Sequence, residues 1–249
     1  MNRFWKHPKN LNWKDLQNNN WDVIELDITF DPLDLLDWCN TVMENNQDSI
    51  WSFDKDYLVD ENALDEFLRQ RKEILVKSDT SIPEQWTLQW SYQREGVLPF
   101  RLLACKKQFP EINDPCFLEK WNQNLDKYFF GWYKKYYELF GPECFTVTRL
   151  VKFPKDCGLN THKDTGGDPP FLIRMHAIPQ IGDDIFLNFG EDLTDKTRHY
   201  KLKPGCVYLF NTGIPHAAIN HSDLDWIMLH NNPSEIAVDN LLKTSMYIK

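Results

Sequence analysis

Short segments typical of β-strands follow one another from about residue 142 onward. Pro, Gly, Asn and Asp separate them, as at Lys203-Pro204-Gly205. Strands are expected at 145–153, 171–178, 184–189, 198–202, 206–211 and 225–230. Two further strands, near 86–92 and 97–104, are expected to join them. Several short strands with such turns indicate a β-sandwich or a β-barrel.

The first half of the chain has helical periodicity instead. Asp31 and Pro32 are typical of a helix N-cap followed by Pro at the first helical position. Apolar residues at helical spacing predict a helix at 62–76, and a long helix that begins at Asp114-Pro115 and ends before Gly141. The aromatic stripe of the long helix is expected to pack flat on a sheet.

These patterns predict an α+β chain, mainly β, that forms a single domain over residues 1–249. Residues 1–142 are expected to form a helical, Trp-rich part with two or three strands that join the sheet. Residues 143–235 form the strand-rich core, and residues 236–249 form a C-terminal tail. A length of 249 residues and a hydrophobic content of 42% supply ample material for one core.

Charge and composition limit the partners. The chain has 28 Lys and Arg against 37 Asp and Glu, and its net charge of −9 gives no general electrostatic reason to bind nucleic acid. No run approaches the roughly 18 apolar residues of a membrane span, and the first ten residues lack the apolar core of a secretory signal. Six scattered cysteines then indicate reduced thiols in the cytoplasm. The expected partner is a small molecule or a peptide, and no pattern indicates an oligomeric state.

His162 and Asp164 are the first candidate metal ligands. They stand two residues apart on an extended segment, so both point to the same side. His216 is the best candidate for the third ligand, because it follows strand 206–211 and Pro215 holds the local backbone extended. Two His and one carboxylate with open positions are typical of non-haem Fe(II) oxygenases, whereas a structural zinc site closes four positions. A lone His-x-Asp pair also arises by chance on surface loops, so the assignment depends on convergence of all three residues.

Arg174 and His176 interrupt an otherwise apolar strand and share one of its faces. A buried Arg needs an anion to offset its desolvation. Either a dicarboxylate held by the planar guanidinium or an internal ion pair satisfies this requirement.

The Gly- and Pro-rich segment 166–170 beside the proposed metal is interpreted as a lid or a plain connection. Asn188, Asn211 and Asn220 flank the proposed cavity and serve either substrate or turns.

Four motifs in this order resemble the aspartyl/asparaginyl β-hydroxylase family of Fe(II)- and 2-oxoglutarate-dependent oxygenases, including its proline hydroxylase-like members: His162-x-Asp164, Arg174-Met-His176, Pro204-Gly205 and Pro215-His216. The resemblance covers roughly residues 145–232. It implies a double-stranded β-helix (jelly-roll, cupin-like) core buttressed by N-terminal helices. It also implies Fe(II) held by His162, Asp164 and His216, O₂ as co-reactant, and 2-oxoglutarate in contact with Arg174 and His176.

One position departs from the family pattern. The family commonly has an Arg ten residues after the distal His, which holds the far carboxylate of 2-oxoglutarate, and here that position is Trp226. Arg174, Lys152, Arg149 and His230 are the candidates to replace this Arg, with Arg174 first.

The resemblance implies an oxygenase that hydroxylates an unactivated C–H bond of an amino acid, a small metabolite or a peptide side chain, and releases succinate and CO₂. Trp226 favours a second hypothesis, a cupin-like metal-dependent dioxygenase or isomerase that does not use 2-oxoglutarate. A third hypothesis is a metal-free β-sandwich that acts as a binding module, with the Trp-rich N-terminal half as its recognition surface.

Overall fold

Strands from both halves of the chain build two sheets. The computed structural model describes residues 3–7, 10–18, 20–45, 98–104, 129–140, 145–153, 155, 157–163 and 173–249. The large sheet runs in the order β1 (Phe4–Lys6), β2 (Val23–Phe30), β8 (Cys206–Asn211), β6 (Ile173–Gln180), β10 (Trp226–Pro233), β4 (Phe145–Phe153) and β3 (Leu98–Ala104), with β11 (Met246–Ile248) also paired to β2. The small sheet has the order β5 (Cys157–His162), β9 (His216–Asn220) and β7 (Ile185–Phe189).

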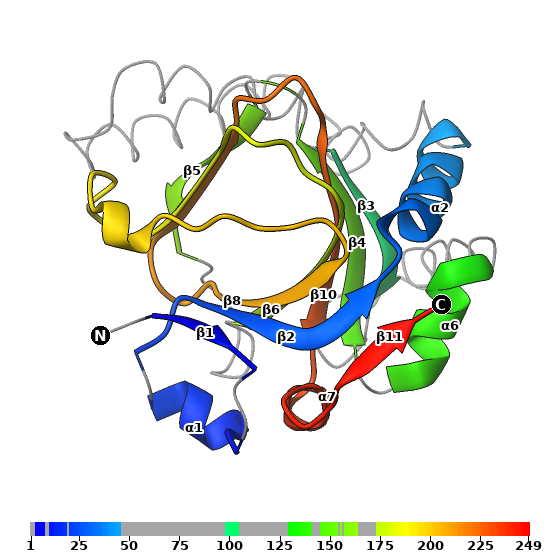
Figure 1. The fold of residues 1–249 in the computed structure, drawn as a ribbon, viewed down its shortest axis with the longest axis horizontal. Coiled ribbons are helices and arrows are strands. Elements are labelled where there is room, and N and C mark those ends of the chain that lie inside the picture. The colour runs from blue at the N-terminus through cyan, green and yellow to red at the C-terminus, as the bar shows by residue number, and fades with distance from the viewer. Residues whose placement is uncertain are drawn as a thin grey trace, which may run out of the picture.

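Successive strands of the second half alternate between the two sheets. The chain passes from β4 in the large sheet to β5 in the small one, then through β6, β7, β8, β9 and β10 in strict alternation. Figure 1 shows these strands winding around a common axis. This alternation defines a double-stranded β-helix, so the expected fold class, an α+β jelly roll that is mainly β, is confirmed.

Helices lie outside the large sheet. They are α1 (Trp13–Asn18), α2 (Pro32–Glu44), α6 (Gly131–Phe140) and α7 (Glu235–Leu241). The α2 helix begins as the sequence predicts, because the Asp31 side chain accepts a hydrogen bond from the Leu33 amide and Pro32 occupies the first turn. Figure 1 shows α2 and α6 next to each other on one flank of the sheet.

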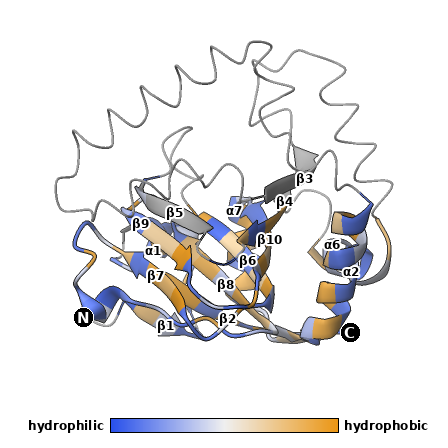
Figure 2. Cartoon of the chain, turned by 90° about the horizontal axis from the view of Figure 1, so that it is seen from above, coloured by the Kyte–Doolittle hydropathy of each residue, from blue (hydrophilic) through white to orange (hydrophobic). Residues whose placement is uncertain are grey.

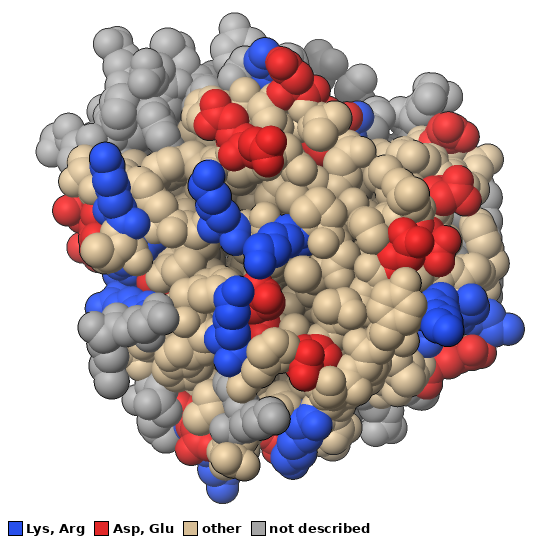
Figure 3. Space-filling model, viewed as in Figure 1, with Lys and Arg blue, Asp and Glu red and all other residues tan. Residues whose placement is uncertain are grey.

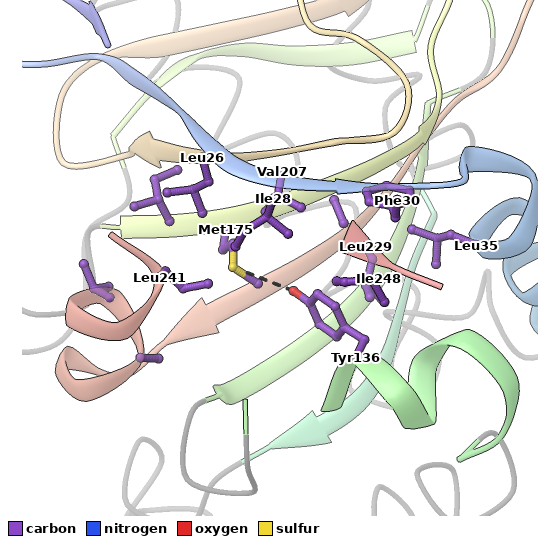
Figure 4. Packing of buried hydrophobic residues seen from close by; sticks show 14 of the residues in the cluster. Leu26, Ile28, Phe30, Leu35, Tyr136, Met175, Val207, Leu229, Leu241 and Ile248 are labelled. Carbon is purple, nitrogen blue, oxygen red and sulfur yellow. Dashed lines mark hydrogen bonds between the residues drawn. The ribbon is translucent and has the colours of Figure 1, made fainter. Parts of the chain in front are cut away.

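Alternate residues of the large sheet face two separate cores. On the outer face, Met175 of β6 packs with residues from β2, β8, β10 and the helices, and Tyr136 of α6 donates a hydrogen bond to its sulfur (Figure 4). On the inner face, Ile178, Phe210 and Met228 pack against the small sheet. Figure 2 shows apolar residues concentrated on the strands, whereas α2 carries both polar and apolar residues. The inner core is the one that borders the proposed site.

The helix predictions need one correction. The helix expected from Asp114 to Gly141 does not run unbroken, because Phe129 and Phe130 are not helical and Gly131 begins α6 with a φ of 55°. Left-handed backbone is tolerated by Gly and interrupts the α-helical path. The aromatic stripe does pack as expected, since Trp132 and Tyr136 are buried. Residues 62–76 and 114–128 lie outside the described part of the chain.

Most strand predictions agree with the structure within two residues. The strand expected at 198–202 is wrong, because Asp195 caps a 3-10 turn at Lys196–Arg198 and only His199 makes an isolated bridge, to Asn188. The segment near 86–92 lies outside the described residues. The expected tail, 236–249, instead contains most of α7 and all of β11, which pairs in parallel with β2.

The surface carries charges of both signs. On the face seen in Figure 3, acidic and basic side chains are interspersed. No helix in the described ranges combines the length and the apolar character needed to cross a membrane.

Candidate functional site

His162 and His216 are brought together by the small sheet. They are 54 residues apart in the chain (216 − 162), yet they are direct partners in the antiparallel pairing of β5 with β9. A register shift between Leu159 and His162 places one extra residue on β5 just before this pair. Opposite residues of antiparallel strands share a face of the sheet. Both positions therefore lie on the same face, at one end of the small sheet.

The surroundings of His216 set its tautomer. Its ring is buried, and its Nδ1 lies 3.0 Å from the Ile214 carbonyl oxygen. Because a carbonyl oxygen only accepts, Nδ1 carries the proton and donates, and in the neutral imidazole Nε2 then carries the lone pair. The ring also stacks on Phe189, with 5.7 Å between centroids. Metal-binding histidines are commonly oriented by such a hydrogen bond from the second ring nitrogen to a carbonyl group.

Asp164, the expected carboxylate ligand, lies outside the described residues. Within the described ranges, no group of three or more His, Cys, Asp or Glu side chains is gathered closely enough to hold a metal. The structure thus places two of the three expected ligands at paired backbone positions.

Arg174, His176 and His230 lie on the inner face of the large sheet. Arg174 and His176 are in phase with Ile178 on β6, and His230 is in phase with Met228 on β10, and both of these apolar residues belong to the inner core. His176 is buried and Arg174 is half-buried. The expectation that Arg174 and His176 share a face is therefore correct, and that face looks toward the small sheet.

A chain of ring contacts joins the two sheets. From His216 on β9 it runs to Phe189, then to Phe210 at 5.5 Å, to His176 at 4.3 Å, and finally to His230 at 4.7 Å between centroids. The two phenyl rings form an apolar wall between the proposed metal ligand and the two histidines of the large sheet. Sequence reasoning missed both Phe residues, although each is in phase with the inner residues of its strand.

The inner face changes from polar to apolar along its strands. One row across the large sheet consists of Arg149, His230 and His176, which are direct cross-strand partners on β4, β10 and β6; we call these three residues the basic row. Deeper positions on the same strands form an apolar floor, defined here as Val151, Phe153, Ile178, Trp226 and Met228. The polar end of the barrel is the end that carries His216 and Arg174.

Trp226 belongs to the apolar floor. It is buried and stacks on Phe153 with 5.0 Å between centroids. Its indole Nε1, although buried, has no hydrogen-bond partner in the described structure. Trp226 stands four residues before His230 on β10, about 13 Å along the strand. The structure therefore gives Trp226 a packing role in the floor.

Lys152 lies on the opposite face of β4. Its neighbours Val151 and Phe153 face the interior, and its Nζ makes an ion pair of 2.6 Å with the Asp225 carboxylate. This placement removes Lys152 from the candidates that face the cavity, because its charge is compensated on the other side of the sheet.

Two of the flanking Asn residues have structural roles. Asn220 is buried, and its amide donates to the carbonyl oxygens of Phe153 and Leu224. Asn211 donates to the Trp21 carbonyl. Asn188 is buried between inward-facing Leu187 and Phe189, so its side chain takes the outer face of β7. None of these positions supports the substrate role considered from the sequence.

A buried network around an ion pair supports Phe189 of the apolar wall. Asp22, fully buried just before β2, accepts two hydrogen bonds from Arg198, at 2.9 and 2.6 Å, and one from the Tyr200 hydroxyl at 2.6 Å. Burial, followed by the hydrogen bond to Asp22, raises the pKa of Tyr200 well above its ordinary value, so its hydroxyl stays protonated and donates. Tyr200 in turn packs on the edge of Phe189. The network therefore supports the apolar wall at Phe189.

Comparisons with known proteins give distant structural likenesses. No protein-family model matches this chain, and no curated protein matches it in sequence. An oxidoreductase of the 2OG-Fe(II) oxygenase family from Burkholderia pseudomallei is similar with a TM-score of 0.35 and 9% identity, over 61% of this chain and 73% of that one. A cupin domain from Bordetella pertussis Tohama I has a TM-score of 0.27 and 16% identity, over 35% and 80%. A predicted oxalate decarboxylase from Thermotoga maritima has a TM-score of 0.30 and 12% identity, over 54% and 77%.

Likenesses at this level carry no conclusion about activity. The fold class rests on the strand order of the chain itself, which alternates between the two sheets from β4 to β10.

Proposed function

We propose that this chain is an Fe(II)- and 2-oxoglutarate-dependent oxygenase. It would hydroxylate an unactivated C–H bond of an amino acid, a small metabolite or a peptide side chain, with release of succinate and CO₂. The observation that carries the proposal is the direct pairing of His162 with His216 across β5 and β9. Asp164, two residues beyond His162, supplies the carboxylate of the proposed ligand set.

The donor set fits iron. Two imidazoles and one carboxylate suit Fe(II) and leave positions open for other ligands. The hydrogen bond from His216 Nδ1 to the Ile214 carbonyl leaves Nε2 as the ligand atom, with its ring held by Phe189. When bound, iron would supply a Lewis acid that a keto acid can coordinate and that reacts with O₂.

The remaining residues of the proposed site would bind the cosubstrate and exclude water. In the proposal, Arg174 and His176 contact 2-oxoglutarate from the large sheet. The phenyl rings of Phe189 and Phe210 contact each other between the two sheets, and the apolar floor would limit the access of water from its end of the barrel. The protein would thus position the reactants and limit the access of water.

A turnover assay tests the proposal. Protein reconstituted anaerobically with Fe(II) is given 2-oxoglutarate, O₂ and a panel of amino acids and peptides, and succinate is measured. We expect succinate from the wild type and a loss of about a hundredfold or more in His216→Ala. The matched control is His199→Ala, whose ring contacts Phe186, and it should keep its activity. If the iron-loaded wild type forms no more succinate than His216→Ala, the proposal is wrong.

A second candidate keeps the metal and omits the cosubstrate, as in a cupin-like dioxygenase or isomerase. The placement of Trp226 in the apolar floor, stacked on Phe153, favours it, because the usual Arg is absent from that position. Tryptophan fluorescence separates the two candidates. Quenching by 2-oxoglutarate that requires the metal supports the oxygenase, whereas metal binding without such quenching supports the second candidate.

A further inference from the structure

Two series of contacts connect His216 with the buried network around Asp22. We call Asp22, Arg198 and Tyr200 the Asp22 network. Asp22 stands just before β2, and its carboxylate accepts hydrogen bonds from Nε and Nη2 of Arg198 and from the Tyr200 hydroxyl. Arg198 and Tyr200 belong to the segment between β7 and β8. The network thus joins the start of a strand in the large sheet to a segment that follows the small sheet.

The first series consists of ring contacts. The Tyr200 ring meets the Phe189 ring edge to face, with 5.6 Å between centroids, and Phe189 stacks on the His216 imidazole at 5.7 Å. All three side chains are buried. Because buried side chains are closely packed, the place of the Tyr200 ring limits where Phe189 lies, and Phe189 limits the rotation of the imidazole.

The second series runs through the backbone. The Gly190 amide donates a hydrogen bond of 2.6 Å to the Pro215 carbonyl, directly before His216. Gly190 has a φ of 133°, and a Cβ there would lie 2.7 Å from Nη1 of Arg198. A glycine lets the guanidinium approach the backbone this closely. The guanidinium is not free to move aside, because Asp22 holds its Nε and Nη2. Arg198 therefore packs firmly against the peptide that donates to Pro215.

The segment held by Gly190 also sets the tautomer of His216. The Nδ1 of His216 donates to the Ile214 carbonyl oxygen at 3.0 Å, and Pro215 lies between these two residues. The hydrogen bond from Gly190 therefore anchors the segment that carries the acceptor. A displacement of this segment would weaken the hydrogen bond from Nδ1 and permit the other tautomer, in which Nε2 carries the proton and has no lone pair for a metal.

Stability alone gives little reason for a charged network at this place. Apolar residues of similar volume often replace a buried ion pair without loss of stability, whereas buried polar groups are best attested where they specify one particular arrangement. Asp22 is fully buried, and a second guanidinium, that of Arg3, lies 3.9 Å from it. The arrangement that this network specifies includes Phe189 and Gly190, which adjoin the His216 ring and the backbone before it.

We propose that the Asp22 network positions the metal ligand His216. Acting through Phe189 and Gly190, it holds the imidazole in one orientation with the proton on Nδ1, so that Nε2 is available to a metal. The inference rests on the proposed function, because it treats His216 as a metal ligand. It adds three positioning residues, all outside the ligand set, on which metal affinity depends.

Two substitutions perturb the two series separately. Tyr200→Phe removes the hydroxyl that Asp22 holds and keeps the ring, whereas Gly190→Ala places a Cβ against Arg198. The Kd for Co(II), added alone and followed by its visible absorption, measures the metal site. We expect the Kd to rise at least about tenfold in Gly190→Ala, the lower end of the range for residues that orient a metal-bound histidine. Tyr200→Phe keeps the contact with Phe189, so a smaller rise of at least about threefold is expected.

The tautomer of His216 gives a second readout that needs no metal. In metal-free protein, ¹⁵N NMR of the histidine rings shows which nitrogen carries the proton, and His216→Ala assigns the signals. The wild type should show the proton on Nδ1 alone. Gly190→Ala should show both tautomers, because the acceptor at Ile214 is displaced. A loss of stability does not by itself change the tautomer of the folded protein.

Matched control variants separate positioning from stability. Gly205→Ala creates a comparable clash at another glycine with positive φ, 2.8 Å from the Phe30 carbonyl oxygen. Tyr208→Phe removes another tyrosine hydroxyl, which donates to Glu25 at 3.3 Å. Neither control should change the Kd for Co(II) or the His216 signals.

The outcomes separate the two proposals. If Gly190→Ala and Tyr200→Phe bind Co(II) as tightly as their controls, the inference is wrong and the proposed metal site remains. The inference is also wrong if the controls weaken Co(II) binding to the same extent. If the wild type binds no Co(II), the proposed function fails, and an unchanged His216 tautomer in Gly190→Ala would then refute the positioning as well. Should Gly190→Ala not fold, Tyr200→Phe decides the question, because it removes only a hydroxyl.

Discussion

Replacing Asp22 with Asn should destabilise the protein strongly. Asp22 is fully buried and accepts three hydrogen bonds, two from Arg198 and one from Tyr200, while Arg3 lies 3.9 Å away. The substitution removes the negative charge and one acceptor but leaves the Arg198 guanidinium in place. Breaking one side of a buried ion pair costs about 3–5 kcal/mol. Because the Arg198 side chain keeps 17% of its surface exposed, water compensates part of the loss, and we expect about 3 kcal/mol.

Urea unfolding followed by tryptophan fluorescence measures this change in the free energy of unfolding. The exposed ion pair between Lys155 and Asp223 provides a matched control, and Asp223→Asn should leave stability unchanged within error. A double variant, Asp22→Asn with Arg198→Met, should recover part of the loss, because it removes both charges. A loss below about 1 kcal/mol in Asp22→Asn would refute this account of the network.

Other predictions concern the backbone and a buried thiol. Gly205→Ala should lower stability by more than about 2 kcal/mol, because Gly205 has a φ of 77° and a new Cβ would lie 2.8 Å from the Phe30 carbonyl oxygen. Gly131 has a φ of 55°, but no atom lies within 4 Å of a new Cβ, so Gly131→Ala should lower the free energy of unfolding by only about 1–2 kcal/mol. If urea unfolding gave the same loss for both Gly variants, the clash at Gly205 would be contradicted. Burial raises the pKa of the Cys39 thiol far above its ordinary value, so iodoacetamide should not label Cys39 in the folded protein even at pH 9. Peptide mapping that finds Cys39 labelled as fast as half-buried Cys206 would contradict its burial.

Sequence patterns predicted the helices and strands that depend on residues close together in the chain. The N-cap at Asp31 and the alternation over 145–153 correspond to α2 and β4 as observed. The alternation of Ile24, Leu26 and Ile28 was also readable, since these residues line the outer core, yet β2 was not predicted. Strand β9 could not be recognised in the same way, because its sequence, HAAIN, is short and rich in Ala, and pairing on both sides holds it in the sheet.

The pairing register between distant strands determines which residues meet at the site, and no local sequence pattern shows this register. The pairing of His162 with His216 depends on an extra residue in β5 after Leu159, which no local pattern reveals. Strand phase, in contrast, would have separated Arg149 from Lys152, because residues three apart on a strand take opposite faces. The place of Trp226 in the apolar floor likewise depends on the antiparallel pairing of β10 with β4, which sets Trp226 opposite Phe153.

The proposed function requires that His162, Asp164 and His216 bind one metal ion. Anomalous diffraction from anaerobic crystals of the Fe(II)-reconstituted protein, recorded at the iron edge, locates that ion. We expect a single peak within bonding distance of both imidazoles and the Asp164 carboxylate, and no such peak in crystals of His216→Ala. A wild-type map without a peak between β5 and β9, or with its peak at another place, would show that these three residues do not form the metal site.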